Sequence, residues 1–334
     1  MSRNKKIILI ITILLVLTGC TKQLKDVNGK IVKNTKTGQT LPANILCQPT
    51  DKDIIKLYDK NKEEYIAKLE KQLKRKKITK SEYKTKLASV TDIKTLPTCK
   101  KFTPASGGYE GVWTTLFVKP LTWLIIQIGS LVRNYGVAVI IITLLIRLAL
   151  YPITKKSAKQ SELMKKAQPE LAKIEKKYKD KNDQQSMQMK SQEMLAAYKK
   201  YGINPASGCI FGFIQIPLFI AFYESLYRLP VLFEDKFLIY KMAVTPSSAA
   251  HLGNYLYLIL PVLVLVVTYF SFKLNSNATM NQDQAKQMKM MMYIMMFVIT
   301  ITSFQMSTAI IIYWITNSAF TIVQNLIVKR SMKK

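Results

Sequence analysis

The sequence predicts an all-α, polytopic membrane protein with five transmembrane helices. Of the 334 residues, 49% are hydrophobic, yet the formal net charge is +30. Apolar runs of membrane length recur after about residue 113, with Lys-rich segments before and between them. One run carries an arginine, Arg147, in its interior. Because a guanidinium stays charged at membrane depth, it must face protein or water, and the other spans must be arranged around it.

Residues 1–19 are predicted to be a cleaved lipoprotein signal peptide. They begin with basic residues, continue with an apolar run over residues 7–17, and lead into Leu-Thr-Gly-Cys. This ending resembles a bacterial lipobox, which implies that Cys20 is the lipidated first residue of the mature chain and anchors its N-terminus outside the membrane. The other interpretation is an uncleaved signal anchor with an incidental Cys20. No cofactor other than this covalent lipid is expected.

Residues 20–112 are predicted to be a lipid-anchored, Lys-rich extracytoplasmic segment. Apolar residues recur at near-helical spacing over residues 51–90, which predicts one or two amphipathic helices. Cys47 and Cys99 either pair in an oxidising exterior or remain two free thiols. The pair would close a loop worth about 4 kcal/mol in the chain-entropy model.

Residues 113–131 predict an amphipathic helix at the membrane interface. Lys119 and Pro120 interrupt its apolar pattern, and Trp113 and Trp123 suit headgroup depth. The alternative is that this segment forms part of a longer first span.

The rest of the chain completes an insertion pattern with the N-terminus outside and the C-terminus inside. Residues 154–202 carry thirteen lysines against six acids and two apolar helical faces, which predicts a cytoplasmic helical hairpin. The predicted elements of the core, residues 113–334, are the interfacial helix 113–131, spans at 135–153, 207–227, 253–272, 288–304 and 306–328, the hairpin 154–202 and a basic tail, 329–334.

Several polar residues lie inside the predicted spans. Thr143 lies one turn before Arg147, Gln215 lies in the second span, and a polar-aromatic stripe follows the last span. The members of this stripe include Tyr313, Trp314, Asn317 and Gln324. These residues either line a hydrated cavity around Arg147 or act as polar contacts between helices, each worth about 0.6 kcal/mol. The alternative is a purely structural role, in which the Arg147 side chain extends to the cytoplasmic interface.

Recognisable catalytic chemistry is absent from the sequence. The single histidine, His251, cannot build a His-based metal cluster, and the four cysteines lack zinc-site spacing. There is no nucleophile elbow, zinc-protease motif or phosphate-binding glycine loop. The sequence therefore predicts a protein that is not an enzyme.

The run Asn204-Pro205-Ala206-Ser207-Gly208-Cys209, continuing to Gln215-Ile216-Pro217, resembles the YidC-type membrane protein insertase family. The order of the core is also similar to the family, with an arginine late in the first span, a charged hairpin, and Tyr-Trp then Asn in the last span. The resemblance covers about residues 113–330, and the lipobox is similar to the Gram-positive form. Phe211 and the run Ser307-Thr308-Ala309 depart from the family pattern, which often has Pro and Pro-x-Gly there. These departures affect local helix geometry.

The resemblance implies a multi-pass insertase of the bacterial cell membrane. Its hydrophilic groove, open to cytoplasm and lipid, would receive nascent membrane proteins. Arg147, Thr143, Gln215 and Trp314 are the residues carried over to that groove. The basic tail and hairpin would approach the ribosome, the Sec translocon is an optional partner, and anionic lipids suit the net charge. No small-molecule substrate is expected.

Two other functions compete with this one. A transporter or channel would use Arg147 to bind an anionic solute, and would require its bidentate geometry. A lipoprotein adhesin or scaffold would depend on residues 21–112. The sequence names neither the clients nor the oligomeric state.

Overall fold

The computed structural model describes residues 22–88, 90, 92–179, 181, 183–204, 207–275 and 282–332. The predicted signal peptide and Cys20 lie outside these residues. Apart from isolated bridges, the described chain is helical, with one short ribbon in which β1 (Lys236–Phe237) pairs antiparallel with β2 (Tyr240–Lys241). It divides into two compact units: a first unit of Met1–Ile142, Pro217–Ile259 and Phe304–Ile312, and a second unit of Thr143–Ile216, Leu260–Ser303 and Tyr313–Lys334.

Three helices are long and apolar enough to cross a membrane within the part of the chain that the structure describes. They are Thr114–Val132, Tyr255–Leu274 and Thr308–Ser331. A fourth crossing arises if α5 (Tyr135–Ala149) and α6 (Tyr151–Lys177), which meet at a bend of 69°, form one broken span. The segment predicted to lie at the interface therefore has the length and composition of a span. The predicted span 135–153 is not one straight helix.

The N-terminal part of the first unit folds around α2 (Lys52–Lys74) and α3 (Lys80–Ala88). Asp51 begins α2 by accepting hydrogen bonds from the backbone N–H groups of Asp53 and Ile54. The apolar face of α2 then packs into a small core, whereas no residue of α3 is buried. The buried members of this core are Leu41, Ile45, Ile54, Tyr58, Ile93 and Phe233. One amphipathic helix and a few loop residues thus supply the apolar burial.

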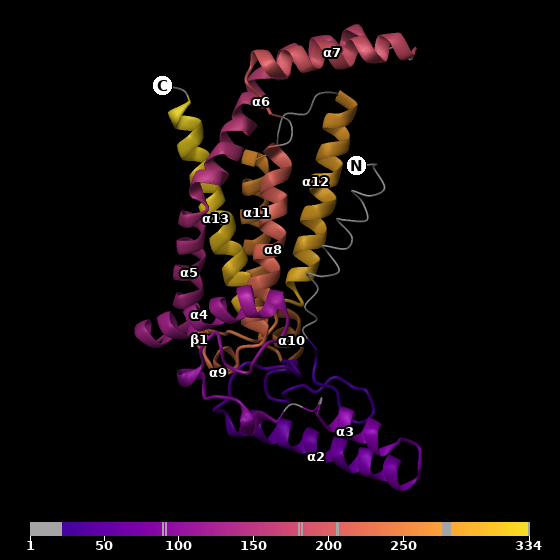
Figure 1. Ribbon diagram of the computed structural model, residues 1–334. Coiled ribbons are helices and arrows are strands. Elements are labelled where there is room, and N and C mark those ends of the chain that lie inside the picture. Colours follow the sequence, from indigo (N-terminus) through magenta and orange to yellow (C-terminus); the bar gives the residue numbers. More distant parts are fainter. Residues whose placement is uncertain are drawn as a thin grey trace. The chain divides into compact units, whose positions relative to one another are not determined.

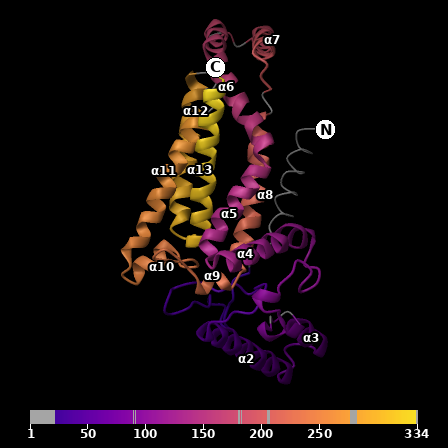
Figure 2. The same ribbon diagram turned by 90° about the vertical axis from the view of Figure 1, so that its left-hand side faces the viewer.

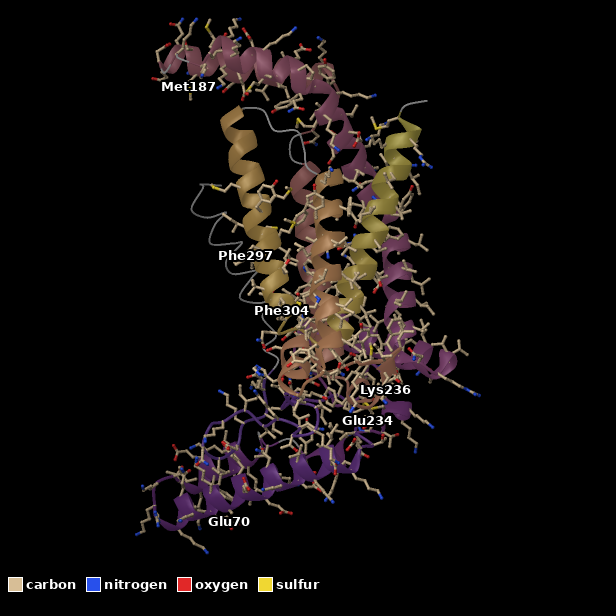
Figure 3. All side chains as sticks on the ribbon, turned by 180° about the vertical axis from the view of Figure 1, so that it is seen from behind. Glu70, Met187, Glu234, Lys236, Phe297 and Phe304 are labelled. Carbon is tan, nitrogen blue, oxygen red and sulfur yellow. A yellow bond between two sulfur atoms is a disulfide. The ribbon has the colours of Figure 1, made fainter. Side chains whose placement is uncertain are left out.

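Distant chain segments hold this core together. Cys47 and Cys99, which begins the short helix η2 (Cys99–Lys101), form a disulfide with an S–S distance of 2.06 Å. Glu234, at the end of α9 (Val231–Glu234), accepts hydrogen bonds of 2.7 Å from the backbone N–H groups of Thr50 and Asp51. Figure 3 labels Glu234 beside the ribbon residue Lys236. The N-terminal segment is therefore fastened to the loop that follows α8.

The first unit continues through a π-helical turn, η3 (Thr114–Val118), into α4 (Lys119–Val132). Arg133 ends α4 in the left-handed conformation with φ 55°, and the chain turns into α5. A Cβ at Gly129 would lie 2.2 Å from the Tyr135 ring, so only glycine allows this close turn. In Figures 1 and 2, α4 lies across the first turns of α5.

The other elements of the first unit follow α9. A capping box of Thr245 and Ser248 begins α10 (Pro246–His251), and η4 (Tyr255–Leu258) leads into α11 (Ile259–Asn275).

The second unit contains helices α6 and α7 (Gln184–Lys200), which pack against each other and lie side by side in Figure 2. Asp183 begins α7 by accepting a hydrogen bond of 2.8 Å from Ser186 N–H. The buried residues between the helices are Ala167, Leu171, Met194, Ala197, Tyr198 and Ile203. Ion pairs Lys177–Glu193 and Lys200–Glu170 flank this core at the surface. The lysine-rich segment thus has its own small apolar core.

Three further helices contribute residues to both units: α8 (Ser207–Tyr227), α11 and α13 (Thr308–Ser331). Helix α12 (Gln282–Ser303) follows α11 and belongs to the second unit. Many apolar side chains on α12 face outward, including Phe297, which is 67% exposed and labelled in Figure 3. Exposed apolar surface of this extent suits contact with lipid acyl chains.

Candidate functional site

Arg147 lies on α5, two residues before the helix ends at Ala149. Its side chain is only 2% exposed, and it belongs to the largest fully buried side chains of the described residues. Thr143, one turn earlier on the same face, is 1% exposed. An apolar helix that buries an arginine so completely must supply its hydrogen-bond partners from neighbouring helices.

The Arg147 guanidinium donates hydrogen bonds to two amide side chains from different helices. Its Nε donates to Oδ1 of Asn317 on α13 over 2.5 Å, and its Nη2 donates to Oε1 of Gln215 on α8 over 2.6 Å. Gln215 Nε2 in turn donates to the Tyr313 hydroxyl over 3.4 Å. Four of the predicted site residues therefore meet in one polar cluster, which we call the Arg147 cluster: Arg147, Gln215, Tyr313 and Asn317.

The other predicted residues make different contacts within the second unit. Gln324 accepts a hydrogen bond of 3.0 Å from the hydroxyl of Thr154 on α6. Trp314 donates from Nε1 to the hydroxyl of Thr268 on α11 over 3.1 Å. The stripe on α13 thus forms hydrogen bonds with three other helices. Asn317 bonds to α5, Gln324 to α6 and Trp314 to α11.

A break in the helix lies next to the Arg147 cluster. Leu150 separates α5 from α6, and the two helices meet at 69°. Pro152 stands in the first turn of α6. Because proline lacks an N–H, Pro152 cannot donate to the carbonyl four residues earlier, and the α5 hydrogen-bond ladder ends there. Arg147 therefore lies at the last complete turn of an apolar helix.

The chemistry available to the Arg147 cluster is recognition of negative charge. A guanidinium offers five N–H donors in a planar fork, which matches a carboxylate or phosphate bidentately. The amides and the tyrosine hydroxyl offer neutral donors and acceptors. Among the described residues, no group of three or more His, Cys, Asp or Glu side chains is placed to hold a metal ion.

A second polar cluster, which sequence reasoning missed, lies in the first unit. Glu110 forms ion pairs of 3.2 Å with Lys119 and 2.5 Å with Arg228, whose side chains are 0% and 3% exposed. Arg228 also donates from Nε to the Asn44 carbonyl over 2.7 Å. Nearby, Trp113 Nε1 donates to Glu224 over 3.2 Å. This cluster joins the loop before α4 to the end of α8.

The titration of Glu110 reflects its two cationic neighbours. Burial alone would raise the pKa of the Glu110 carboxyl, but Arg228 and then Lys119 outweigh burial and hold the pKa below its usual value. Little in the sequence marks Glu110 as part of a charged cluster. It is the one acid between residues 93 and 161, and it closely follows two glycines. Nothing in its spacing indicates a partner 118 residues away.

Comparisons with known proteins place the chain in a family. The family model described as "60Kd inner membrane protein" matches residues 127–334. The membrane protein insertase YidC of Oceanobacillus iheyensis is 36% identical over 232 residues, which cover 69% of this chain and 88% of that protein. The insertase MisCA of Bacillus subtilis is 37% identical over 136 residues, 40% of this chain and 52% of the relative. The YidC protein of Oleidesulfovibrio alaskensis is 44% identical over 114 residues, which cover 34% of this chain and 20% of that protein. The matched region contains the whole Arg147 cluster, and the chain belongs to the YidC-type family of bacterial membrane proteins.

Proposed function

We propose that this chain is a membrane protein insertase, which receives the polar external segment of a nascent membrane protein at the Arg147 cluster. The relatives compared above are membrane protein insertases. The observation that carries the proposal is Arg147 itself, a buried cation held by uncharged amides near the end of an apolar helix. Such a cation attracts acidic residues of a client more strongly than any neutral side chain would.

The driving force would come from the client. Burial of its apolar helix in lipid contributes about 25 cal/mol per Å² removed from water. A polar surface at membrane depth, formed by the Arg147 cluster with Thr143, would lower the cost of moving the client's polar segment. The protein would therefore act without a catalytic residue, a cofactor or a small-molecule substrate.

Orientation and anchoring form part of the proposal. The thirteen lysines among residues 153–201 favour a cytoplasmic position for α6 and α7, with the N-terminus outside, the C-terminus inside and five spans. A lipid on Cys20 would tether the mature N-terminus to the bacterial cell membrane. Single cysteines at the exposed Met187 of α7 and at Glu70 of α2 test this orientation. The first should be labelled from inside only, and the second from outside only.

The partners in this proposal are nascent membrane proteins, anionic lipids and, through the basic tail and the α6–α7 segment, the ribosome. The Sec translocon is an optional partner. Reconstitution without ribosome or translocon separates intrinsic insertion from assisted insertion.

The test is insertion into liposomes of a purified single-span client with an acidic external tail. Wild type and Arg147→Lys should insert the client, since Lys keeps the positive charge, whereas Arg147→Ala should lose about tenfold or more. Arg75→Ala, at an exposed position after α2, is the matched control and should match wild type. Absence of insertion by wild type, beside an active reference insertase, would overturn the proposal. Failure of Arg147→Lys alone would favour a bidentate anion site of the transporter type.

A further inference from the structure

Two of the acceptors that hold Arg147 are neutral amides from two different helices. Asn317 Oδ1 lies 2.5 Å from Nε, and Gln215 Oε1 lies 2.6 Å from Nη2. An amide oxygen carries partial charge, whereas a carboxylate carries a full one. A hydrogen bond with one ionised partner is already about twice as strong as a neutral one, but a carboxylate adds a second, opposite charge and can accept from both nitrogens at once. These two amides are therefore weaker ligands than the one that the chemistry of Arg147 prefers.

We propose that Asn317 and Gln215 are surrogate ligands that hold the Arg147 guanidinium in the resting protein and are displaced by a carboxylate of the incoming client. This inference rests on the proposed function and names the residues that decide which clients the protein accepts.

Burial explains why a surrogate is needed. Arg147 is 2% exposed and Asn317 is 7% exposed, so an arginine that lacked these acceptors would leave buried donors unsatisfied. Neutral acceptors supply these hydrogen bonds without a full negative charge at positions 215 and 317. A fixed carboxylate at either position would satisfy Arg147 so well that an external carboxylate could not compete.

The amide N–H groups of Gln215 and Asn317 have hydrogen-bond acceptors after displacement. Gln215 already donates to the Tyr313 hydroxyl over 3.4 Å, so it keeps one partner after it releases Arg147. Asn317 retains amide donors that can hydrogen-bond a second carboxylate oxygen. The exchange therefore replaces two neutral acceptors of Arg147 with a charged one, while the amide N–H groups of Gln215 and Asn317 keep or gain an acceptor.

The critical variant is Asn317→Asp. It keeps the size and shape of the side chain and converts the surrogate into a carboxylate fixed beside Arg147. The resident acid acts at an effective concentration that a client in trans cannot match. We expect insertion of the acidic-tailed client to fall about tenfold or more, to the level of a client whose acidic residues are replaced by Asn and Gln. The ratio of acidic-client to neutral-client insertion should therefore fall toward one.

Asn325→Asp is the matched control. Asn325 lies on the same helix, is buried to the same 7%, and follows Asn317 by eight residues, about 12 Å along the axis. The same charge change at this position should not reproduce discrimination between acidic and neutral clients. A general effect of a buried acid on α13 would appear in both variants, and equal selective losses would overturn the proposal.

Thermal unfolding separates the surrogate role from a structural one. The ion pair that Asn317→Asp creates between Arg147 and the introduced carboxylate should leave the melting temperature unchanged or raise it while acidic-client insertion falls. A merely structural Asn317 would lose stability and insertion of both clients together. Acidic-client insertion at the wild-type level in a folded Asn317→Asp protein would refute the surrogate role and leave the insertase proposal intact. Absence of insertion by wild type would instead remove the insertase proposal on which the inference rests.

Discussion

Arg147 on α5 donates from Nε to Oδ1 of Asn317 on α13, and these two residues are 170 positions apart in the chain. The contact joins a charged donor to an uncharged acceptor in a buried environment, where it is stronger than the same contact in water. The contact therefore fixes the position of the guanidinium. Because Asn317 is uncharged, the contact does not neutralise the positive charge of Arg147.

The first prediction concerns Gln215, which contacts both Arg147 and Tyr313. Gln215→Leu keeps the size of the side chain but removes one acceptor of Arg147 and one donor to Tyr313. We expect a loss of about 1–3 kcal/mol in the free energy of unfolding, measured in lipid nanodiscs, because a buried guanidinium loses a partner. Ile216→Leu, at the next position and 48% exposed, is the control and should change stability by less than about 0.5 kcal/mol. Equal stabilities for the two variants would contradict the contact.

The second prediction concerns the hydrogen bond from Trp314 to Thr268. Trp314→Phe and Thr268→Val each remove the bond, so their effects on the free energy of unfolding should not add. A double-mutant cycle should give a coupling of about 0.6 kcal/mol, the average for such contacts between membrane helices. A coupling of zero would show that the two groups do not interact in the membrane. Insertion by Trp314→Phe measures separately whether the indole N–H serves clients.

The sequence predicted that Arg147 must face protein or water, because a charge inside an apolar run is costly wherever the helices lie, and the structure buries it against other helices. The sequence was insufficient to predict its ligands. Gln215 and Asn317 were expected to be polar residues near the arginine. Which of them touches it depends on the rotation of α8 and α13 about their axes, which periodicity alone does not set.

The helix break at Leu150 and the charged cluster around Glu110 also depend on packing that the sequence pattern does not determine. Pro152 was visible in the sequence, but its consequence, a 69° bend at Leu150, depends on what the chain packs against afterwards. Glu110 meets Arg228 only because the loop before α4 folds onto the end of α8. Contacts between distant loops leave no periodic pattern, so sequence reasoning had no signal to follow.

The third prediction concerns the disulfide between Cys47 and Cys99, which closes a loop with a sequence separation of 52. Cys47→Ser combined with Cys99→Ser should lower the stability of the N-terminal segment by about 4 kcal/mol, since the unfolded chain regains its loop entropy. Limited trypsin digestion should then cleave the Lys-rich helix α2 faster. Reduction of the wild type should produce the same fragments. Undiminished protection would contradict a stabilising disulfide. Insertion should persist because the Arg147 cluster contains no residue of this segment.

The last prediction is a pH dependence that originates at Glu110. Its pKa is held below the usual value of 4.5 in the folded protein by Arg228 and Lys119. A depressed folded-state pKa contributes stability that is fully present above the unfolded-state pKa and is lost as pH falls through the folded-state pKa. At pH 7, Glu110→Gln should therefore cost about 1–3 kcal/mol, a figure reduced from that of a fully buried pair because the Glu110 side chain is 35% exposed.

The difference in unfolding free energy between wild type and Glu110→Gln should shrink below about pH 4.5, because protonation then removes the same charge from the wild type that the variant lacks. Glu70→Gln makes the same chemical change at an exposed position of α2 and controls for the loss of one negative charge from the chain. Unfolding curves between pH 7 and pH 3 measure both differences. A gap for Glu110→Gln that stays constant across this range would mean that its carboxylate charge does not stabilise the fold, and that Lys119 and Arg228 are held by their backbone acceptors alone.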